Sequence, residues 1–194
     1  ESCILLNNLA LVKITRLLLP ELKRRPQAFI LNVASMAAFF PMPFMPVYGS
    51  SKSFVLNFSV ALREEMAGTS VSVSVLCPNG IRTNAECKQK IDSHGLIGRL
   101  VSMDPDQVAV IAMRGLFASK PVIVPGFFNR CIATLGRHAP RSLVCAVVSS
   151  FYGKTAAQPC AAGPPCCPAP PCQGPASPAP RRRRRQPAAY EGAI

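Results

Sequence analysis

The sequence is poor in histidine and in acidic residues. It holds two histidines, and nine acidic side chains against 22 lysines and arginines, for a formal net charge of +13. His94 and His138 lack the spacing of metal ligands, so we expect surface or core side chains and no metal site. The basic excess suits an anionic partner such as a phosphate, a nucleic acid or a lipid, but charge alone does not choose among them.

Long uninterrupted apolar runs are also missing from the sequence. We therefore expect no transmembrane span, and the chain shows no signal peptide, because no basic, apolar and small-residue regions follow one another at its start. These absences favour a cytoplasmic protein. The chain begins with Glu1 and not with methionine, which suggests a fragment.

Nine cysteines fall into two groups. The first group is scattered singly through apolar sequence, as buried thiols of a reducing compartment are, and the second crowds into a proline-rich tail without a histidine nearby. We expect the tail cysteines to be part of a low-complexity segment and not zinc ligands. The scattered cysteines are Cys3, Cys77, Cys87, Cys131 and Cys145, and the tail cysteines are Cys160, Cys166, Cys167 and Cys172.

The composition predicts one folded domain followed by an unstructured tail. A hydrophobic fraction of 49% is enough for a real core, which we place in residues 1–155. Residues 156–194 are biased to proline, cysteine and arginine, and we assign them no fold. The run Arg181–Arg185 could bind nucleic acid electrostatically, but no aromatic interleaving accompanies it, so a solvated tail is the favoured interpretation.

Apolar periodicity predicts alternating helices and strands in the first part of the chain. Residues 4–25 have helical spacing, and residues 28–35 read as a strand that is covered on both faces. Helical spacing returns over residues 48–68, and residues 71–78 read as a second strand that Pro78 ends. A strand, a helix and a strand in this order predict parallel strands joined by a right-handed crossover.

The pattern continues toward the tail. An acidic start with Pro105 in the first turn predicts a helix over residues 104–118, and residues 120–126 read as a short buried strand. Residues 127–151 are basic and amphipathic, and Pro140 interrupts them. This last segment could pack over the sheet or a partner subunit, which we favour, or lie on a membrane. The expected fold is α/β, with a doubly wound parallel sheet.

Three polar side chains surround an apolar, proline-rich loop. Tyr48 and Lys52 are four residues apart on a predicted helix, so their side chains share a face. An ammonium beside a phenol favours the phenolate, which makes tyrosine usable as a general acid or base near neutral pH. Ser35 lies at the carboxyl end of the preceding strand, the edge of a parallel sheet where ligands bind. By itself this pattern is compatible with a proton-transfer site at this edge, and equally with a tyrosine at a helix start and an exposed lysine one turn later.

Four motifs in order resemble the short-chain dehydrogenase/reductase family: Asn7 in LLNNLALVKITRLLLP, Ser35 in ILNVAS, the YGSSK stretch, and CPNGIRT after the next strand. The resemblance implies a Rossmann-type fold and an NAD- or NADP-dependent oxidoreductase that interconverts a carbonyl and an alcohol. It implies that Tyr48 is the catalytic acid or base, that Lys52 supports it and binds the nicotinamide ribose, and that Ser35 holds the substrate oxygen. Asn7 would anchor a water in the proton relay, with Asn8 as the weaker candidate.

The resemblance also implies a cofactor site, a substrate pocket and a homodimer or homotetramer. The loop between Ser35 and Tyr48 either lines a pocket for a lipid-, steroid- or acyl-like compound or simply packs onto the core, and both interpretations stay open. The expected cofactor-binding residues are Tyr48, Lys52, Pro78, Asn79, Gly80, Ile81 and Thr83, and the expected pocket residues are Ser35, Ala37, Phe39, Phe40 and Phe44.

Two departures from the family pattern stand out. The usual Pro-Gly turn reads Pro78-Asn79-Gly80, and we expect asparagine to replace glycine because it tolerates positive φ. No G-x-x-x-G-x-G phosphate loop occurs in these residues, so the resemblance covers the equivalent of the second half of a family member. We therefore expect this polypeptide to bind nicotinamide nucleotides weakly and to be inactive. The alternative is a non-catalytic truncated protein that acts through binding or oligomerisation.

Overall fold

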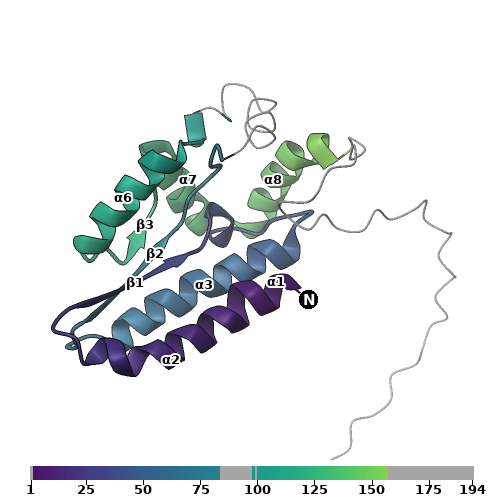
Figure 1. Ribbon diagram of the computed structural model, residues 1–194. Helices are drawn as coiled ribbons and strands as arrows, with labels where there is room; N and C mark the ends of the chain where they lie inside the picture. The colour runs from purple at the N-terminus through teal and green to yellow at the C-terminus, as the bar shows by residue number, and fades with distance from the viewer. Residues whose placement is uncertain (1, 84–97, 99, 157–194) are drawn as a thin grey trace, which may run out of the picture. The chain divides into compact units, whose positions relative to one another are not determined.

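The computed structural model describes residues 2–83, 98 and 100–156 (Figure 1). Three parallel strands form its sheet in the order β1-β2-β3, where β1 is Ala28–Val33, β2 is Val71–Leu76 and β3 is Val122–Ile123. Ala28 pairs with Val71 and Val33 with Leu76, so β1 and β2 run in register over their whole length. The predicted parallel sheet is confirmed.

One face of the sheet is covered by the N-terminal helical segment and by α3, Pro46–Glu65 (Figure 1). The N-terminal segment consists of α1 (Ser2–Ile4), a π-helical stretch η1 (Leu5–Ala10) and α2 (Leu11–Lys23). Val71, Val73 and Val75 of β2 point to this face, where they meet Val55 and Leu62 of α3 and Leu19 and Leu22 of α2. These residues form the larger part of the core.

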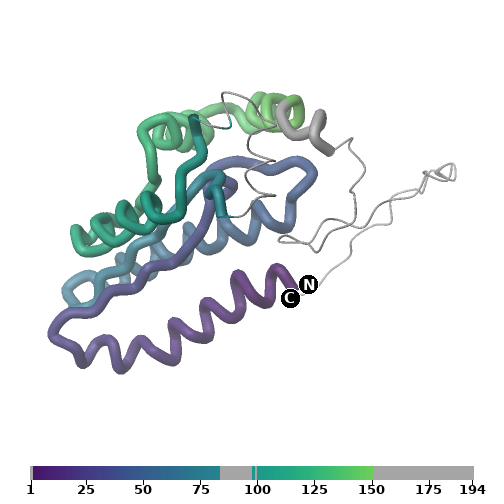
Figure 2. Tube along the Cα trace, turned by 45° about the horizontal axis from the view of Figure 1, so that its top comes forward, coloured from purple at the N-terminus to yellow at the C-terminus, as the bar shows by residue number. Residues whose placement is uncertain are grey.

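The other face of the sheet is covered by α6, Pro105–Phe117. Leu76 of β2 and Ile123 of β3 pack against Val108 and Ala112 of this helix. Figure 2 shows the purple N-terminal helix and the green helices on opposite sides of the strands. Because helices cover both faces, the predicted doubly wound, Rossmann-type arrangement is confirmed for the described part of the chain.

Two further helices, α7 (Phe127–His138) and α8 (Arg141–Ala156), follow β3 and flank Pro140, as the sequence predicted. The strand expected over residues 120–126 is only two residues long. Pro121 and Pro125 have no amide N–H for the ladder, and this limits the pairing on either side of Val122 and Ile123. The predicted tail, residues 156–194, lies outside the described residues except for Ala156, the last residue of α8.

The expectation of no membrane-spanning segment has to be qualified. The helical segment Ser2–Lys23 has 22 residues and contains an 18-residue stretch with a mean hydropathy of 1.5, of which 6% is buried, so it could cross a membrane by length and composition. This is weak evidence for a span, because a core helix or a signal sequence passes the same test. Asn7 and Asn8 on this segment hydrogen bond Ser51 of α3, which ties one side of it to the domain.

Candidate active site

Ser35 lies just past the carboxyl end of β1. Its backbone is extended, with φ −166° and ψ 163°, and it caps a short 3₁₀ turn, η2, over Met36–Ala38. The Ser35 Oγ accepts a hydrogen bond from the Ala37 N–H at 3.2 Å. The backbone on either side of it is tied to β2, because the Ala34 N–H donates to the Leu76 carbonyl and the Met36 N–H to the Pro78 carbonyl. The serine hydroxyl is thus fixed at the edge that the sequence predicted.

Tyr48 and Lys52 lie in the first two turns of α3, which begins at Pro46, a residue suited to a first helical turn. The Lys52 Nζ lies 5.9 Å from the centroid of the Tyr48 ring and donates a hydrogen bond to the Val33 carbonyl at 3.2 Å. This hydrogen bond holds the ammonium next to the last residue of β1. The lysine charge, the phenol and Ser35 therefore belong to one edge of the sheet.

Gly49 lets the loop close over α3. A Cβ added at Gly49 would lie 3.0 Å from the Met42 Cβ, a contact that a larger side chain could relieve only by shifting the loop. Met42 in turn packs with Ala37, and Tyr48 lies against the same cluster. The glycine of the YGSSK stretch thus allows the loop that follows Ser35 to pack closely beside Tyr48.

A chain of hydrogen bonds joins Asn7 to Tyr48. The Asn7 Nδ2 donates to the Ser51 Oγ at 3.2 Å, and the Ser51 Oγ donates to the Tyr48 carbonyl at 2.8 Å. Asn7 lies within the π-helical stretch, where wider helical turns are often found at functional sites. Asn8 also faces α3, since its Nδ2 donates to the Ser51 carbonyl, and its buried Oδ1 has no hydrogen-bond partner among the described residues.

Sequence reasoning missed one of the residues that shape this edge. Ser51 links Asn7 to Tyr48, and its spacing of three residues from Tyr48 was the signal that could have indicated it.

Cys77 follows β2 and is fully buried, as the sequence predicted. Burial raises the pKa of the Cys77 thiol to about 12, although a hydrogen bond with the Ser35 backbone and the charge of Lys52 act in the opposite direction. This thiol is therefore neutral at physiological pH and is a packing residue beneath Ser35, with no role as a nucleophile.

The Pro78-Asn79-Gly80 turn is held by side-chain amides. The Asn79 Oδ1 accepts a hydrogen bond from the Gly80 N–H, and its Nδ2 donates to the Asn129 Oδ1 at 3.0 Å. Neither Asn79 nor Gly80 has a positive φ, so the expectation that asparagine replaces a left-handed glycine was wrong. Asparagine serves here through its side chain, and its partner Asn129, 50 residues later in α7, had no signal in the sequence.

Ile81 and Thr83 continue from this turn along the same edge. Ile81 forms an isolated parallel bridge with Met103, made by the Gly80 carbonyl and the Arg82 N–H. The peptide groups of Ile81 itself are thus not used in the bridge, and its carbonyl accepts the Thr83 N–H at 3.0 Å. Thr83 is exposed. Within the described residues no group of three or more histidine, cysteine or acidic side chains is arranged for a metal ion.

The four hydrophobic residues expected to line a pocket have different surroundings. Ala37 is buried against Met42, and Phe40 packs on the same cluster. Phe39 packs on the core beside Ala34 and Val55. Phe44 is 51% exposed. The structure therefore places Phe39 and Phe40 in packing contacts and leaves Phe44 as the aromatic ring that reaches solvent.

A cavity lies at the opposite edge of the sheet. It has a volume of about 900 Å³ and is lined by Gln27, Thr69, Ser70 and Ser119, near the amino-terminal ends of β1 and β2. Ser35, Tyr48 and Lys52 do not line it. The volume of this cavity is therefore not a measure of the size of a substrate at the predicted site.

Comparison with known proteins places the motifs in context. Residues 1–93 match the family model of the short chain dehydrogenases. Human 17-beta-hydroxysteroid dehydrogenase type 3 is 40% identical over 83 residues, which are 43% of this chain and 27% of the relative. The ketoacyl reductase HetN of Nostoc is 42% identical over 72 residues, 37% of this chain and 25% of the relative. The match thus spans roughly a quarter of the length of these relatives.

Solved structures support the fold. A structure from a study of 7beta-hydroxysteroid dehydrogenase stereoselectivity is similar with a TM-score of 0.66 at 18% identity, over 75% of this chain and 57% of that one. A short chain dehydrogenase from Burkholderia cenocepacia in complex with NADP is similar with a TM-score of 0.56 at 20% identity, over 76% of this chain and 56% of that one. At these identities the similarity shows the Rossmann fold alone.

Proposed function

Over residues 1–93 this chain belongs to the short chain dehydrogenase family, and from this premise we propose that its protein is a nicotinamide-dependent oxidoreductase that interconverts a carbonyl and an alcohol. The position of Lys52 carries the proposal. Its ammonium lies 5.9 Å from the centroid of the Tyr48 ring. It also donates a hydrogen bond to the carbonyl of Val33, the last residue of β1, two residues before Ser35. A cation, a phenol and a hydroxyl at a carboxyl edge form a suitable set for proton transfer to a substrate oxygen.

Each polar side chain has a distinct role in this proposal. Tyr48 moves the proton at its Oη, and Lys52 favours the charged form of the phenol through its own charge. Ser35 donates a hydrogen bond to the substrate oxygen and so fixes its position. Asn7 supports the backbone of Tyr48 through Ser51 and anchors a water in the proton relay.

The cofactor in this proposal is NAD or NADP, and the residues present fit its nicotinamide half. Lys52 offers an ammonium for ribose hydroxyls, and the Ile81 peptide, left outside the bridge with Met103, and the exposed Thr83 offer polar groups for a carboxamide. When bound, the nicotinamide supplies or accepts the hydride. Pro78, Asn79 and Gly80 set the path of the chain toward Ile81.

We propose an apolar substrate, lipid-, steroid- or acyl-like in class. The loop between Ser35 and Tyr48 is almost wholly apolar, and Phe44 is exposed on it. Relatives that match this chain include a hydroxysteroid dehydrogenase and a ketoacyl reductase. A homodimer or homotetramer is part of the same proposal, because Phe54 on α3 and Leu6 and Leu17 on the N-terminal helical segment expose apolar side chains.

The test of these roles uses the complete protein with a glycine-rich phosphate loop ahead of these residues. Tyr48→Phe should lower kcat by about 10²–10⁴-fold, because it removes the proton donor but keeps the ring. The Kd for the nicotinamide nucleotide should stay within about threefold, since the ring still packs beside Lys52. Tyr190→Phe, the same substitution at a tyrosine to which the proposal gives no role, is the control. Retained turnover in Tyr48→Phe would show that the assigned role is wrong.

The 194 residues alone should bind nicotinamide nucleotides weakly and show no turnover, because their sequence has no G-x-x-x-G-x-G loop for the pyrophosphate. Carbonyl reduction by the purified chain would contradict this expectation.

A second candidate is a non-catalytic protein that acts through pairing with another chain. In the described sheet β1 pairs with β2 alone, so its outer edge offers peptide groups to a further strand. Mass spectrometry of the N-terminus of the native protein separates the two: an upstream glycine-rich loop favours the enzyme, and a native start at Glu1 favours the second candidate.

A further inference from the structure

Helix α7 carries three different stripes along its length. Asn129 and Ala133 are buried on one stripe. Phe128, Ile132 and Leu135 form an apolar stripe on one side of it, with exposed fractions of 53%, 38% and 70%. Arg130 and Arg137 form an exposed basic stripe on the other side. Each stripe follows helical spacing, so α7 presents an apolar flank and a basic flank to solvent at once.

The exposed apolar surface extends to both sides of this flank. Phe127, in the first turn of α7, is 73% exposed, and Leu143 and Val147, one turn apart on α8, are 57% and 59% exposed. His138 and Arg141 lie exposed at the junction of the two helices. The apolar groups of α7 and α8 are thus accompanied by basic groups throughout.

From these observations we infer that α7 and the start of α8 bind the surface of an anionic lipid bilayer, with the Phe128–Ile132–Leu135 flank of α7 in the interface. A helix with aromatic and aliphatic residues on one face and arginine on another lies in the interface plane, with its apolar face in the headgroup boundary. The helix is about 10 Å wide, comparable to the Debye length at physiological salt, so Arg130 and Arg137 still act on the lipid charge.

Charge argues against a second copy of the chain as the occupant of this surface. No acidic residue occurs between Asp106 and Glu191, so every charged side chain of α7 and α8 is basic. Two copies that met through these helices would bring Arg130, Arg137 and Arg141 toward their own equivalents, and like charges oppose such contact. An anionic headgroup layer complements the same charges.

The apolar and basic surface of α7 and α8 lies close to the proposed substrate site. Gly136 of α7 lies against Phe40, because a Cβ there would be 2.7 Å from a ring carbon of Phe40. Val144 and Val148 of α8 pack on Ala37 and Met42. Both helices therefore lie over the loop that joins Ser35 to Tyr48. If the proposed function holds, a bilayer bound here lies next to the site of an apolar substrate; the lipid binding itself does not depend on that function.

Sedimentation of the 194-residue chain with vesicles tests the inference. The vesicles are phosphatidylcholine alone or a two-to-one mixture of phosphatidylcholine and phosphatidylserine. The double variant Phe128→Ser, Leu135→Ser should bind the mixed vesicles at least tenfold more weakly, because two apolar anchors are lost. The matched control is Leu6→Ser, Leu17→Ser, which removes two exposed apolar side chains, 72% and 78% exposed, from the N-terminal helical segment. Its binding should stay within twofold of wild type.

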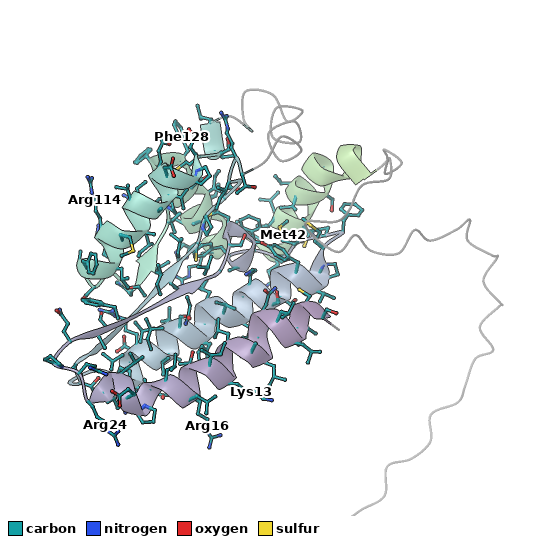
Figure 3. The ribbon with its side chains drawn as sticks, in the orientation of Figure 1. Lys13, Arg16, Arg24, Met42, Arg114 and Phe128 are labelled. Carbon is teal, nitrogen blue, oxygen red and sulfur yellow. The ribbon has the colours of Figure 1, made fainter. Side chains whose placement is uncertain are left out.

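A second test removes two basic side chains and leaves the apolar flank of α7 intact. Arg137→Gln, Arg141→Gln should weaken binding to the mixed vesicles by about twofold to fivefold per charge, because Arg137 lies across the helix from the apolar flank. Lys13→Gln, Arg16→Gln, on α2, is the control and should have the smaller effect. Figure 3 shows Phe128 on one side of the described fold and Lys13 and Arg16 on the other. All variants alter exposed side chains, and circular dichroism melting checks that each remains folded.

Three results would overturn the inference. Equal binding by wild type and both α7 variants would assign the binding to another part of the chain, such as Arg181–Arg185. A larger loss in the Leu6, Leu17 control would assign it to the N-terminal helical segment. A wild-type dimer in solution that the Phe128, Leu135 variant converts to a monomer would make the flank an interface between copies.

Discussion

Two loops leave the sheet at the same edge, one after β1 and one after β2, and they are held in different ways. The loop after β1 is held by apolar packing: Ala37 and Met42 are buried, and α8 covers them. The turn after β2 is held by amide hydrogen bonds between Asn79 and Asn129. The first loop leads from Ser35 to Tyr48, and the second leads to Ile81 and Thr83.

The difference shows how the proposed site separates two tasks. Apolar packing depends on volume and tolerates a change of shape, which would suit the role of substrate wall that we propose for the first loop. Hydrogen bonds between side-chain amides depend on direction and fix a backbone path, which would suit the role of cofactor contact that we propose for the second. Variants at each loop should therefore fail in different ways.

The largest effect is expected in the packed loop. Met42 is 7% exposed, so Met42→Ala should leave a cavity and cost about 2–4 kcal/mol of the free energy of unfolding in urea. The control is Met113→Ala on α6, where the side chain is 43% exposed and the cost should be below about 0.5 kcal/mol. Equal costs would show that packing does not hold this loop.

The amide-held turn should be somewhat less sensitive. The Asn129 Nδ2 donates to the carbonyls of Val101 and Pro125, and its Oδ1 accepts from Asn79. Asn129→Ala removes a hydrogen bond from the buried Pro125 carbonyl and from the half-buried Asn79 and Val101 groups, and should cost about 2–3 kcal/mol in the same assay. Thr134→Ala, an exposed position on the same helix, is the control and should be near neutral. A similar loss of unfolding free energy in Asn129→Ala and Thr134→Ala would show that the amide hydrogen bonds do not hold this turn.

Cys77 lies beneath both loops, and its thiol predicts a pH dependence. The raised pKa, about 12 against an ordinary value of 9.0, means that the folded state keeps the proton where the unfolded state releases it. Stability should therefore fall between pH 9 and 12, by up to about 1.4 kcal/mol per pH unit from this group. Urea unfolding of Cys77→Ala should give a flatter curve over this range. An unchanged slope would contradict the burial effect.

The smallest effect concerns backbone strain in the packed loop. Phe44 has φ +69°, a left-handed conformation that asparagine adopts at lower cost than phenylalanine. Because its ring is half exposed, little packing is lost, and Phe44→Asn should stabilise the protein by about 0.5–1 kcal/mol, seen as a rise in Tm of about 1–4 °C. Phe54→Asn, in the middle of α3, should lower the Tm. A fall in Tm for Phe44→Asn would mean that the ring packs more than its exposure indicates.

The sequence predicted most of the fold because the elements have strong periodicity. Ala28–Val33 is largely apolar, Val71–Leu76 alternates valine with serine, and the helices beside them repeat at helical spacing, so pairing in parallel followed from their order. The third strand was overestimated, because Pro121 and Pro125 limit a ladder that the apolar residues alone suggested.

The candidate site was predictable only in part. Ser35, Tyr48 and Lys52 were found from local spacing together with the ordered motifs that resemble the family. Asn129 did not, because its partner Asn79 is 50 residues away and a single asparagine in an amphipathic helix carries no pattern. Contacts between distant polar residues depend on the packing of whole helices, which periodicity does not specify.

The most direct test of the central claim is a crystal structure of the complete protein with a nicotinamide nucleotide and a ketone bound. We predict that the Ser35 Oγ and the Tyr48 Oη both lie within about 3.2 Å of the ketone oxygen, with Lys52 at the nicotinamide ribose. A ketone oxygen bound away from both hydroxyls would contradict the account.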